Sequence, residues 1–209
     1  MTKDKAKLIM ERLAAVYPDA KPELKYKTAF ELLIAVILSA QCTDKRVNIV
    51  TDELFKEYNT PQKILSLGEE GLAEMIKSCG LYKSKAAHIL SATEDIIKKF
   101  GGEVPEDLES LRTLAGVGRK TANVVYSVAF GGDAIAVDTH VFRVSNRIGL
   151  VREKDVYKTE LALMEILEKK SWRKAHHYLI YLGRSFCKAA RPDCENCPIN
   201  DICEKHIKE

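Results

Sequence analysis

Two cations follow a pair of glycines at a point where a helix is expected to begin. The segment LAGVGRKTANVV (residues 114–125) places Gly116 and Gly118 before Arg119 and Lys120. A helix start carries the positive end of the macrodipole, which disfavours cations there by about 0.3–1 kcal/mol. Glycine permits close approach of a partner, and amides at a helix start can hold a phosphate oxygen. The pattern indicates either a helical hairpin that faces an anion or a packed hairpin with solvated cations.

A carboxylate stands at the next predicted helix start. In AIAVDTHVFRV (residues 134–144), Asp138 occupies an N-cap position, and most aspartates at such positions do nothing more than cap the helix. The positive end of a helix also favours the ionised form of a carboxylate. An ionised carboxylate there suits the stabilisation of a cationic intermediate.

Four of the six cysteines lie close together near the end of the chain, in the spacing C-x6-C-x2-C-x5-C. They are Cys187, Cys194, Cys197 and Cys203. Four thiolates this close in an intracellular protein predict one metal site. The spacing matches neither the usual zinc repeats nor the ferredoxin pattern, so structural zinc, an iron–sulfur cluster and a chance grouping stay open. Cys42 and Cys79 are expected to be small buried hydrophobes.

Helical periodicity dominates the chain and strand alternation is nearly absent, which predicts an all-α fold class. A Thr28-to-Glu31 capping box opens the most apolar helix, and a Thr60–Pro61 start opens a short one. In the first helix, one buried face is expected to hold Leu8, Ile9, Leu13 and Val16. Helices are expected at 4–17, 29–39, 44–58, from 61, 69–79, 84–100, 105–113, 119–130, 138–148, 154–169 and 173–187.

Length and composition are those of a soluble globular protein. A chain of 209 residues, 46% hydrophobic and 30% charged, can bury one large core or two small ones. The net charge of +3 is compatible with nucleic acid but too small to indicate it alone. The first residues lack the apolar stretch of a secretory signal, and the apolar run at 29–40 is too short for a bilayer. We therefore expect no membrane partner and a cytoplasmic location, where disulfides are rare.

Together these motifs resemble the endonuclease III family of helix-hairpin-helix DNA glycosylases. The resemblance rests on LAGVGRKTANVV, AVDTHVFRV and the cysteine spacing, with SAQCTD (39–44) and GLYKSKA (80–86), and it extends over most of the chain. It implies a two-domain fold: a six-helix barrel domain over 22–132 that carries the hairpin, and a domain built from 1–21 and 133–209. The second domain would hold a 4Fe-4S cluster, and DNA would lie across the cleft between the two.

The resemblance also implies roles for single residues. Lys120 would attack the sugar carbon C1′ of a damaged nucleotide and expel the base, while Asp138 would assist proton transfer and stabilise the sugar cation. Because the attacking amine must first lose its proton, a closed pocket that strips water from it is expected. Gln41 would fill the gap left by the flipped base, and Leu81 would be the apolar wedge beside it. Without the resemblance, these two would be a loop glutamine and a packed leucine.

Phosphate contacts are expected from the hairpin residues Gly116, Gly118 and Arg119. Lys188 and Arg191 lie between the first two tail cysteines, in a loop suited to backbone phosphate. The resemblance makes the four tail cysteines the ligands of the 4Fe-4S cluster.

The function implied is that of a bifunctional DNA glycosylase and AP lyase of base excision repair. It would remove oxidised pyrimidines from duplex DNA through a lysine Schiff base and cut the strand 3′ to the abasic site by β-elimination. Its partner would be double-stranded DNA with damaged pyrimidines or abasic sites, and we expect a monomer associated with the nucleoid. The alternatives are a mismatch-type glycosylase and a non-catalytic DNA-binding module. Lys120 together with Asp138 argues against the module, because phosphate binding needs neither.

Overall fold

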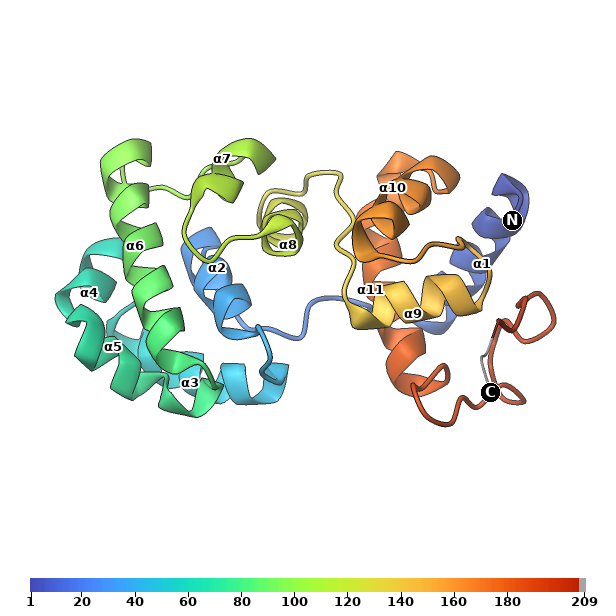
Figure 1. The fold of residues 1–209 in the computed structure, drawn as a ribbon, viewed down its shortest axis with the longest axis horizontal. Helices are drawn as coiled ribbons and strands as arrows, with labels where there is room; N and C mark the ends of the chain where they lie inside the picture. Colours follow the sequence, from blue (N-terminus) through green and yellow to red (C-terminus); the bar gives the residue numbers. More distant parts are fainter. Residues whose placement is uncertain (207–209) are drawn as a thin grey trace. The chain divides into compact units, whose positions relative to one another are not determined.

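The structure is a computed structural model that describes residues 1–206. These residues form eleven α-helices and two short 3-10 helices, with no strand among them, which confirms the predicted all-α class. The chain divides into two compact units, coloured along the sequence in Figure 1. One unit is Pro22–Gly131, and the other joins Met1–Lys21 to the segment that starts at Gly132.

The unit of residues 22–131 is built around one apolar helix. Nine of the ten residues of α2 are buried, and Figure 1 shows α2 between α6 and α8. A helix apolar on all sides is stable only when neighbours enclose it, so α2 is the centre of this core. The elements in chain order are α2 (Ala29–Leu38), α3 (Asp44–Glu57), α4 (Pro61–Ser66), α5 (Gly68–Met75), η1 (Lys77–Cys79), α6 (Tyr82–Phe100), α7 (Leu108–Thr113) and α8 (Arg119–Ala129).

The other unit has a separate core, in which α9 packs closely against α11. A Cβ added at Gly183 of α11 would lie 3.0 Å from the Val144 side chain of α9, so this glycine sets how near the two helices approach. No helix or strand occurs in the described tail after 185. The elements are α1 (Lys3–Val16), α9 (Thr139–Arg147), α10 (Val156–Ile166), η2 (Lys169–Ser171) and α11 (Trp172–Ser185).

Side-chain caps begin α2 and α4 at the positions that the sequence predicts. Thr28 accepts a hydrogen bond from the Glu31 amide at 3.1 Å, and Thr60 accepts one before Pro61 at the first position of α4. The carboxylate of Glu31 accepts from the Lys27 amide at 2.6 Å. The capping box therefore reaches one residue further back than its usual form, in which Thr28 would be the donor.

Several predicted boundaries and one predicted face are wrong. The segment 69–79 is not one helix, because α5 ends at Met75 and η1 follows, and α6 begins at Tyr82, ahead of the predicted 84. The helix expected from 105 begins at Leu108, because Asp107 caps it through the Ser110 amide at 2.8 Å.

On α1 the buried face is different from the predicted one. Leu8 is 40% exposed and Val16 is 43% exposed. At 100° per residue the buried stripe passes through Ala6, Ile9 and Met10 to Leu13, and Leu8 lies on the opposite side. Val16 belongs to the last turn, where the helix leaves the core.

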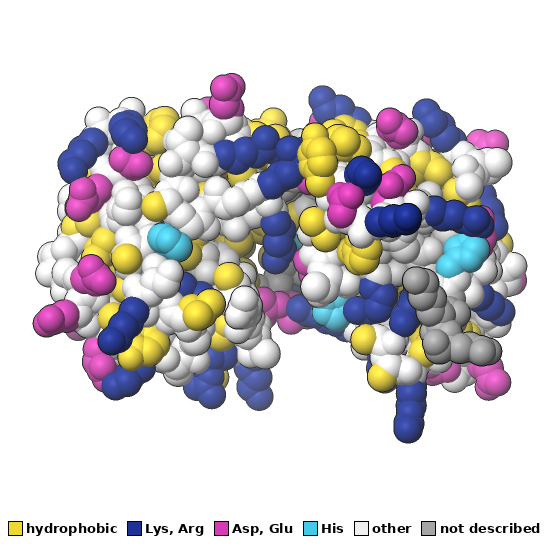
Figure 2. Space-filling model, viewed as in Figure 1, with side chains coloured by type: hydrophobic (Ala, Val, Ile, Leu, Met, Phe, Trp, Pro, Cys, Tyr) yellow, Lys and Arg dark blue, Asp and Glu magenta, His cyan; other side chains and the backbone are white. Residues whose placement is uncertain are grey.

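The surface and the helix lengths agree with the composition. On the face displayed in Figure 2, Lys and Arg side chains are interspersed with Asp and Glu. Within residues 1–206, no helix is both long enough and apolar enough to cross a bilayer.

Candidate functional site

The hairpin predicted at 114–125 is formed by the turn between α7 and α8. Leu114 and Val117 are buried and anchor the turn in the core of its unit. The Val117 amide donates to the Leu114 carbonyl at 3.1 Å and closes the turn. Gly116 and Gly118 are both exposed. The buried side chains of Leu114 and Val117 thus fix the turn, and the backbone at its two glycines faces solvent.

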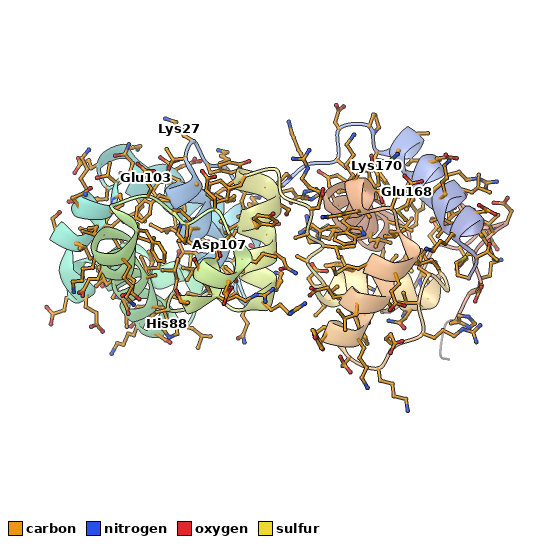
Figure 3. The ribbon with its side chains drawn as sticks, turned by 90° about the horizontal axis from the view of Figure 1, so that it is seen from above. Lys27, His88, Glu103, Asp107, Glu168 and Lys170 are labelled. Carbon is orange, nitrogen blue, oxygen red and sulfur yellow. The ribbon has the colours of Figure 1, made fainter. Side chains whose placement is uncertain are left out.

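The two glycines differ in conformation and surroundings. Gly116 has φ of 74° and lies against His88, which projects from α6 (Figure 3). Gly118 has φ of −80°, and no atom lies within 4 Å of the position a Cβ would occupy. Gly118 is also the N-cap of α8, and no side chain caps that helix. The first amides of α8 are therefore open to an anion from outside.

Lys120 lies in the first turn of α8. Its side chain is exposed and Arg119 beside it is half-buried, while the next positions of the helix, Ala122 and Asn123, are buried. The first turn contains no acidic residue. Within its own unit, Lys120 is therefore an exposed lysine one position after the half-buried Arg119.

Asp138 is the N-cap of α9, as predicted. Its Oδ1 accepts a hydrogen bond from the Val141 amide at 2.7 Å, and the side chain is half-buried. Buried residues on both sides, Val137 and Val141, fix the chain here. The carboxylate is therefore held in one orientation by the helix that it begins.

Gln41 and Leu81 share an unusual backbone. Among the described residues only three other than glycine have positive φ, and two of these are Gln41 at 54° and Leu81 at 51°. Both side chains are exposed, Leu81 to 59%. The left-handed region costs such residues of order 1–3 kcal/mol, and this strain concentrates at functional sites. The sequence contains no signal of this conformation, because glutamine and leucine rarely adopt it.

The four tail cysteines line one small hollow, which Ile148, Phe186 and Pro192 also border. Burial raises the pKa of Cys197 and of Cys203, and the neighbouring tail thiols add to the effect. Within the described residues, no three His, Cys, Asp or Glu side chains are grouped as ligands of a single metal ion. Lys188 and Arg191 are exposed on the loop between the first two cysteines.

Two arginines of α9, which none of the sequence motifs singled out, hold that loop. Arg143 donates to the Cys187 carbonyl at 3.1 and 3.2 Å and to the Gly183 carbonyl at 3.0 Å. Arg147 donates to the carbonyls of Lys188 and Ala189 at 2.7 and 2.8 Å. Their i, i+4 spacing on the helix that Asp138 begins is the sequence signal that could have revealed them.

A hollow of about 700 Å³ lies among α1, η2 and α11, outside these groups. Lysines line it, but acidic neighbours pair with two of them. Lys170 lies 2.9 Å from Glu168, a pair labelled in Figure 3, and Lys7 lies 4.0 Å from Glu11. The pairing lowers the attraction of this hollow for an anion.

Comparisons with known proteins give one consistent result. Residues 34–169 match the model of the HhH-GPD superfamily base excision DNA repair protein. The chain is 52% identical over 204 residues to endonuclease III of Haemophilus influenzae, covering 98% of this chain and 97% of that protein. It is 46% identical to endonuclease III of Escherichia coli strain K12, with the same two coverages.

The fold gives the same answer. The structure of a trapped endonuclease III–DNA covalent intermediate is similar to this one, with a TM-score of 0.93 and 48% sequence identity. That similarity covers 98% of this chain and 97% of the other.

Proposed function

The chain belongs to the endonuclease III family of HhH-GPD base excision DNA repair proteins, and we propose that Lys120 is its nucleophile and Asp138 the assisting carboxylate. It is a bifunctional DNA glycosylase and AP lyase that acts on damaged duplex DNA. Its base substrates are oxidised pyrimidines. It works as a monomer in the cytoplasm, at the nucleoid.

The reaction begins at the amine of Lys120. The nitrogen forms a bond to C1′ of the damaged nucleotide, while the bond from C1′ to the base breaks and the base leaves with a proton. The sugar ring then opens, and the nitrogen and C1′ form a Schiff base. Loss of a proton from C2′ expels the 3′ phosphate oxygen, which breaks the strand on the 3′ side.

The exposure of Lys120 determines where its neutral form arises. The Lys120 side chain is exposed at the start of α8. Bound DNA covers it, and the extruded nucleotide provides the dry surroundings that favour an uncharged amine. Lys120 is then reactive only when a nucleotide occupies the site.

Asp138 has two functions at once. The N-cap hydrogen bond to the Val141 amide occupies Oδ1 and fixes the carboxylate, which leaves Oδ2 to accept a proton. The negative charge stabilises the cationic sugar that forms as the base departs. A residue that caps a helix in this way enters the reaction already oriented.

DNA is gripped through its backbone and opened by insertion. The amides of Gly118 and the first turn of α8 hold a phosphate with Arg119, and Lys188 with Arg191 holds another. The exposed side chains of Gln41 and Leu81 enter the duplex, and their contacts offset the cost of extruding the damaged base. The unit of residues 22–131 is the barrel domain of the family, and the other unit is the cluster domain.

The tail holds a 4Fe-4S cluster through its four cysteines. Four thiols around one hollow form a donor set that suits iron–sulfur clusters and zinc alike. Cys187, Cys194, Cys197 and Cys203 would hold the cluster, and the family resemblance favours iron–sulfur over zinc. When bound, the cluster organises the loop that carries Lys188 and Arg191, and it takes no part in the bond changes above.

One observation carries this proposal. The exposed amine of Lys120 follows the uncapped start of α8, in a chain 48% identical to an enzyme trapped covalently on DNA. The test is borohydride reduction during turnover of a thymine-glycol duplex, which fixes a Schiff base as a stable covalent complex.

Wild-type protein should form this complex, and Lys120→Gln should form none while still binding the lesion. Arg119→Gln is the matched control, because it removes the neighbouring cation and leaves the amine. It should form the complex when the duplex is saturating. Trapping by Lys120→Gln at the wild-type rate would assign the nucleophile to another amine.

A further inference from the structure

Lys85 is a buried lysine in the first turn of α6, and the reaction described above does not use it. The residue is only 4% exposed, and the hydrogen-bond acceptors of its Nζ atom are main-chain carbonyls, not carboxylates. Burial lowers its pKa from the ordinary value. A buried ammonium without a counter-ion is costly, and such groups persist where hydrogen bonds hold them.

Two main-chain carbonyls hold this ammonium. The Nζ atom donates to the Leu38 carbonyl at 2.8 Å and to the Cys79 carbonyl at 2.6 Å. Leu38 is the last residue of α2 and Cys79 the last residue of η1. Carbonyls at helix ends lack a donor within their own helix, and Lys85 supplies one to both. A single side chain thus joins two helix ends that are far apart in the sequence.

These two helix ends lead into the two strained residues of the candidate site. Three residues after Leu38 comes Gln41, with φ of 54°, and two residues after Cys79 comes Leu81, with φ of 51°. Burial raises the pKa of the Cys79 thiol to about 11, and the nearby thiol of Cys42, the residue next to Gln41, adds to the effect. The two loops therefore meet at their bases, beside Lys85.

We propose that Lys85 is a positioning residue for base extrusion, because its hydrogen bonds to Leu38 and Cys79 hold the loops that carry Gln41 and Leu81. This inference rests on the roles proposed above for Gln41 and Leu81. The left-handed conformations are then set before DNA binds, so binding does not have to impose them. Loss of Lys85 weakens extrusion of a paired base and leaves the lysine chemistry of Lys120 intact.

The test compares a substrate that must be unstacked with one that has no base. Lys85→Met keeps the length and apolar stem of the side chain and removes the donors. On a thymine-glycol duplex, single-turnover excision should slow about tenfold, the factor expected when one strained conformation is no longer preset. On an abasic duplex, borohydride trapping should stay within about twofold, because no base has to leave the stack.

Fluorescence of 2-aminopurine placed next to the lesion reports unstacking directly. Its rise on binding should be smaller for Lys85→Met than for wild type. Lys83→Met is the matched control, because it removes an exposed cation from the same turn of α6. It should lower binding to both duplexes by the same factor and leave the ratio of the two rates unchanged.

A double-mutant cycle separates positioning from general stability. In a Gln41→Ala background, Lys85→Met should add less than its effect in wild type, because one of the positioned side chains is already gone. Equal slowing on both duplexes, or fully additive effects, would overturn the proposal. If Lys85→Met does not fold, Lys85→Gln is used instead, because its amide donor can still satisfy one of the buried carbonyls. Its rates on the thymine-glycol and abasic duplexes are compared in the same way.

Failure of the proposed roles has a different signature. If Gln41→Ala and Leu81→Ala excise thymine glycol at the wild-type rate, the insertion roles are wrong and Lys85 has nothing to position. If those variants are slow and Lys85→Met is not, only the assignment of Lys85 fails.

Discussion

A side chain at Gly116 would collide with His88: the Cβ position at Gly116 lies 2.9 Å from the Cβ of His88. Gly116 also has φ of 74°, a conformation that side chains rarely adopt. Gly118 has an ordinary extended backbone and open space around its Cβ position. The fold requires the first glycine, and the second leaves the start of α8 accessible.

Alanine at these two positions should therefore affect stability to very different degrees. Gly116→Ala should lower the free energy of unfolding by about 1–3 kcal/mol, because of the positive φ and the contact with His88. Gly118→Ala should change it by less than about 0.5 kcal/mol. Denaturant unfolding of both variants measures the difference.

Gly118→Ala, which should hardly change stability, should weaken DNA binding. It should bind damaged and undamaged duplexes more weakly by the same factor, because backbone amides contact phosphate and not bases. Affinity of the wild type should fall steeply with salt. If Gly118→Ala bound undamaged DNA normally and discriminated lesions worse, the hairpin would contact bases.

Local signals in the sequence predicted most of the helices. Thr28, Thr60 and Asp138 are side-chain caps in the structure as predicted, because an N-cap acts over only three residues. The similarity to endonuclease III confirms the fold class and the function that the resemblance implied. The roles of single residues stay predictions.

What the sequence could not predict depends on contacts between distant segments. The left-handed angles of Gln41 and Leu81 are set by their loops, and no residue type signals them. Lys85 looks like any helix lysine until Leu38 and Cys79 are placed beside it. The exposure of Lys120 likewise follows from the fold around it.

The tail should lose its iron when one ligand is removed. Wild-type protein purified without oxygen should be yellow-brown, with about four iron atoms and four sulfides per chain. Cys194→Ser should lower the iron content and the stability of its unit, because ligand binding free energy is also folding free energy. The control Cys42→Ser lies outside the tail and should retain full iron. A colourless wild-type preparation with stoichiometric zinc would contradict the cluster.

His177 should make the protein less stable in acid. Burial, with lesser contributions from His176 and Arg173, lowers its pKa from 6.5 to about 3. Between these two values the unfolded chain binds a proton that the folded chain does not. The free energy of unfolding should therefore fall as the pH drops from 6.5 toward 3, by up to about 1.4 kcal/mol per pH unit.

His177→Phe retains a ring and removes the titration. Urea unfolding at several pH values should give a shallower dependence for this variant than for wild type. Any loss of the cluster in acid affects both proteins equally, so the difference between the two curves is the measurement. Parallel curves would show that His177 is not the group responsible.

Asp138 allows its structural and chemical functions to be separated by two substitutions. Asparagine is as good an N-cap as aspartate, so Asp138→Asn should retain the hydrogen bond to the Val141 amide and the stability of α9. Asp138→Ala should lose the cap and about 1 kcal/mol of unfolding free energy. Both remove the proton acceptor and the charge opposite the sugar cation, so both should slow borohydride trapping by about a hundredfold.

Because Asp138→Asn retains the amine of Lys120, its trapping rate should recover partly at higher pH, where more of that amine is neutral. If the stable variant Asp138→Asn were trapped by borohydride at the wild-type rate, Asp138 would be only a helix cap. The carboxylate that assists Lys120 would then be another one.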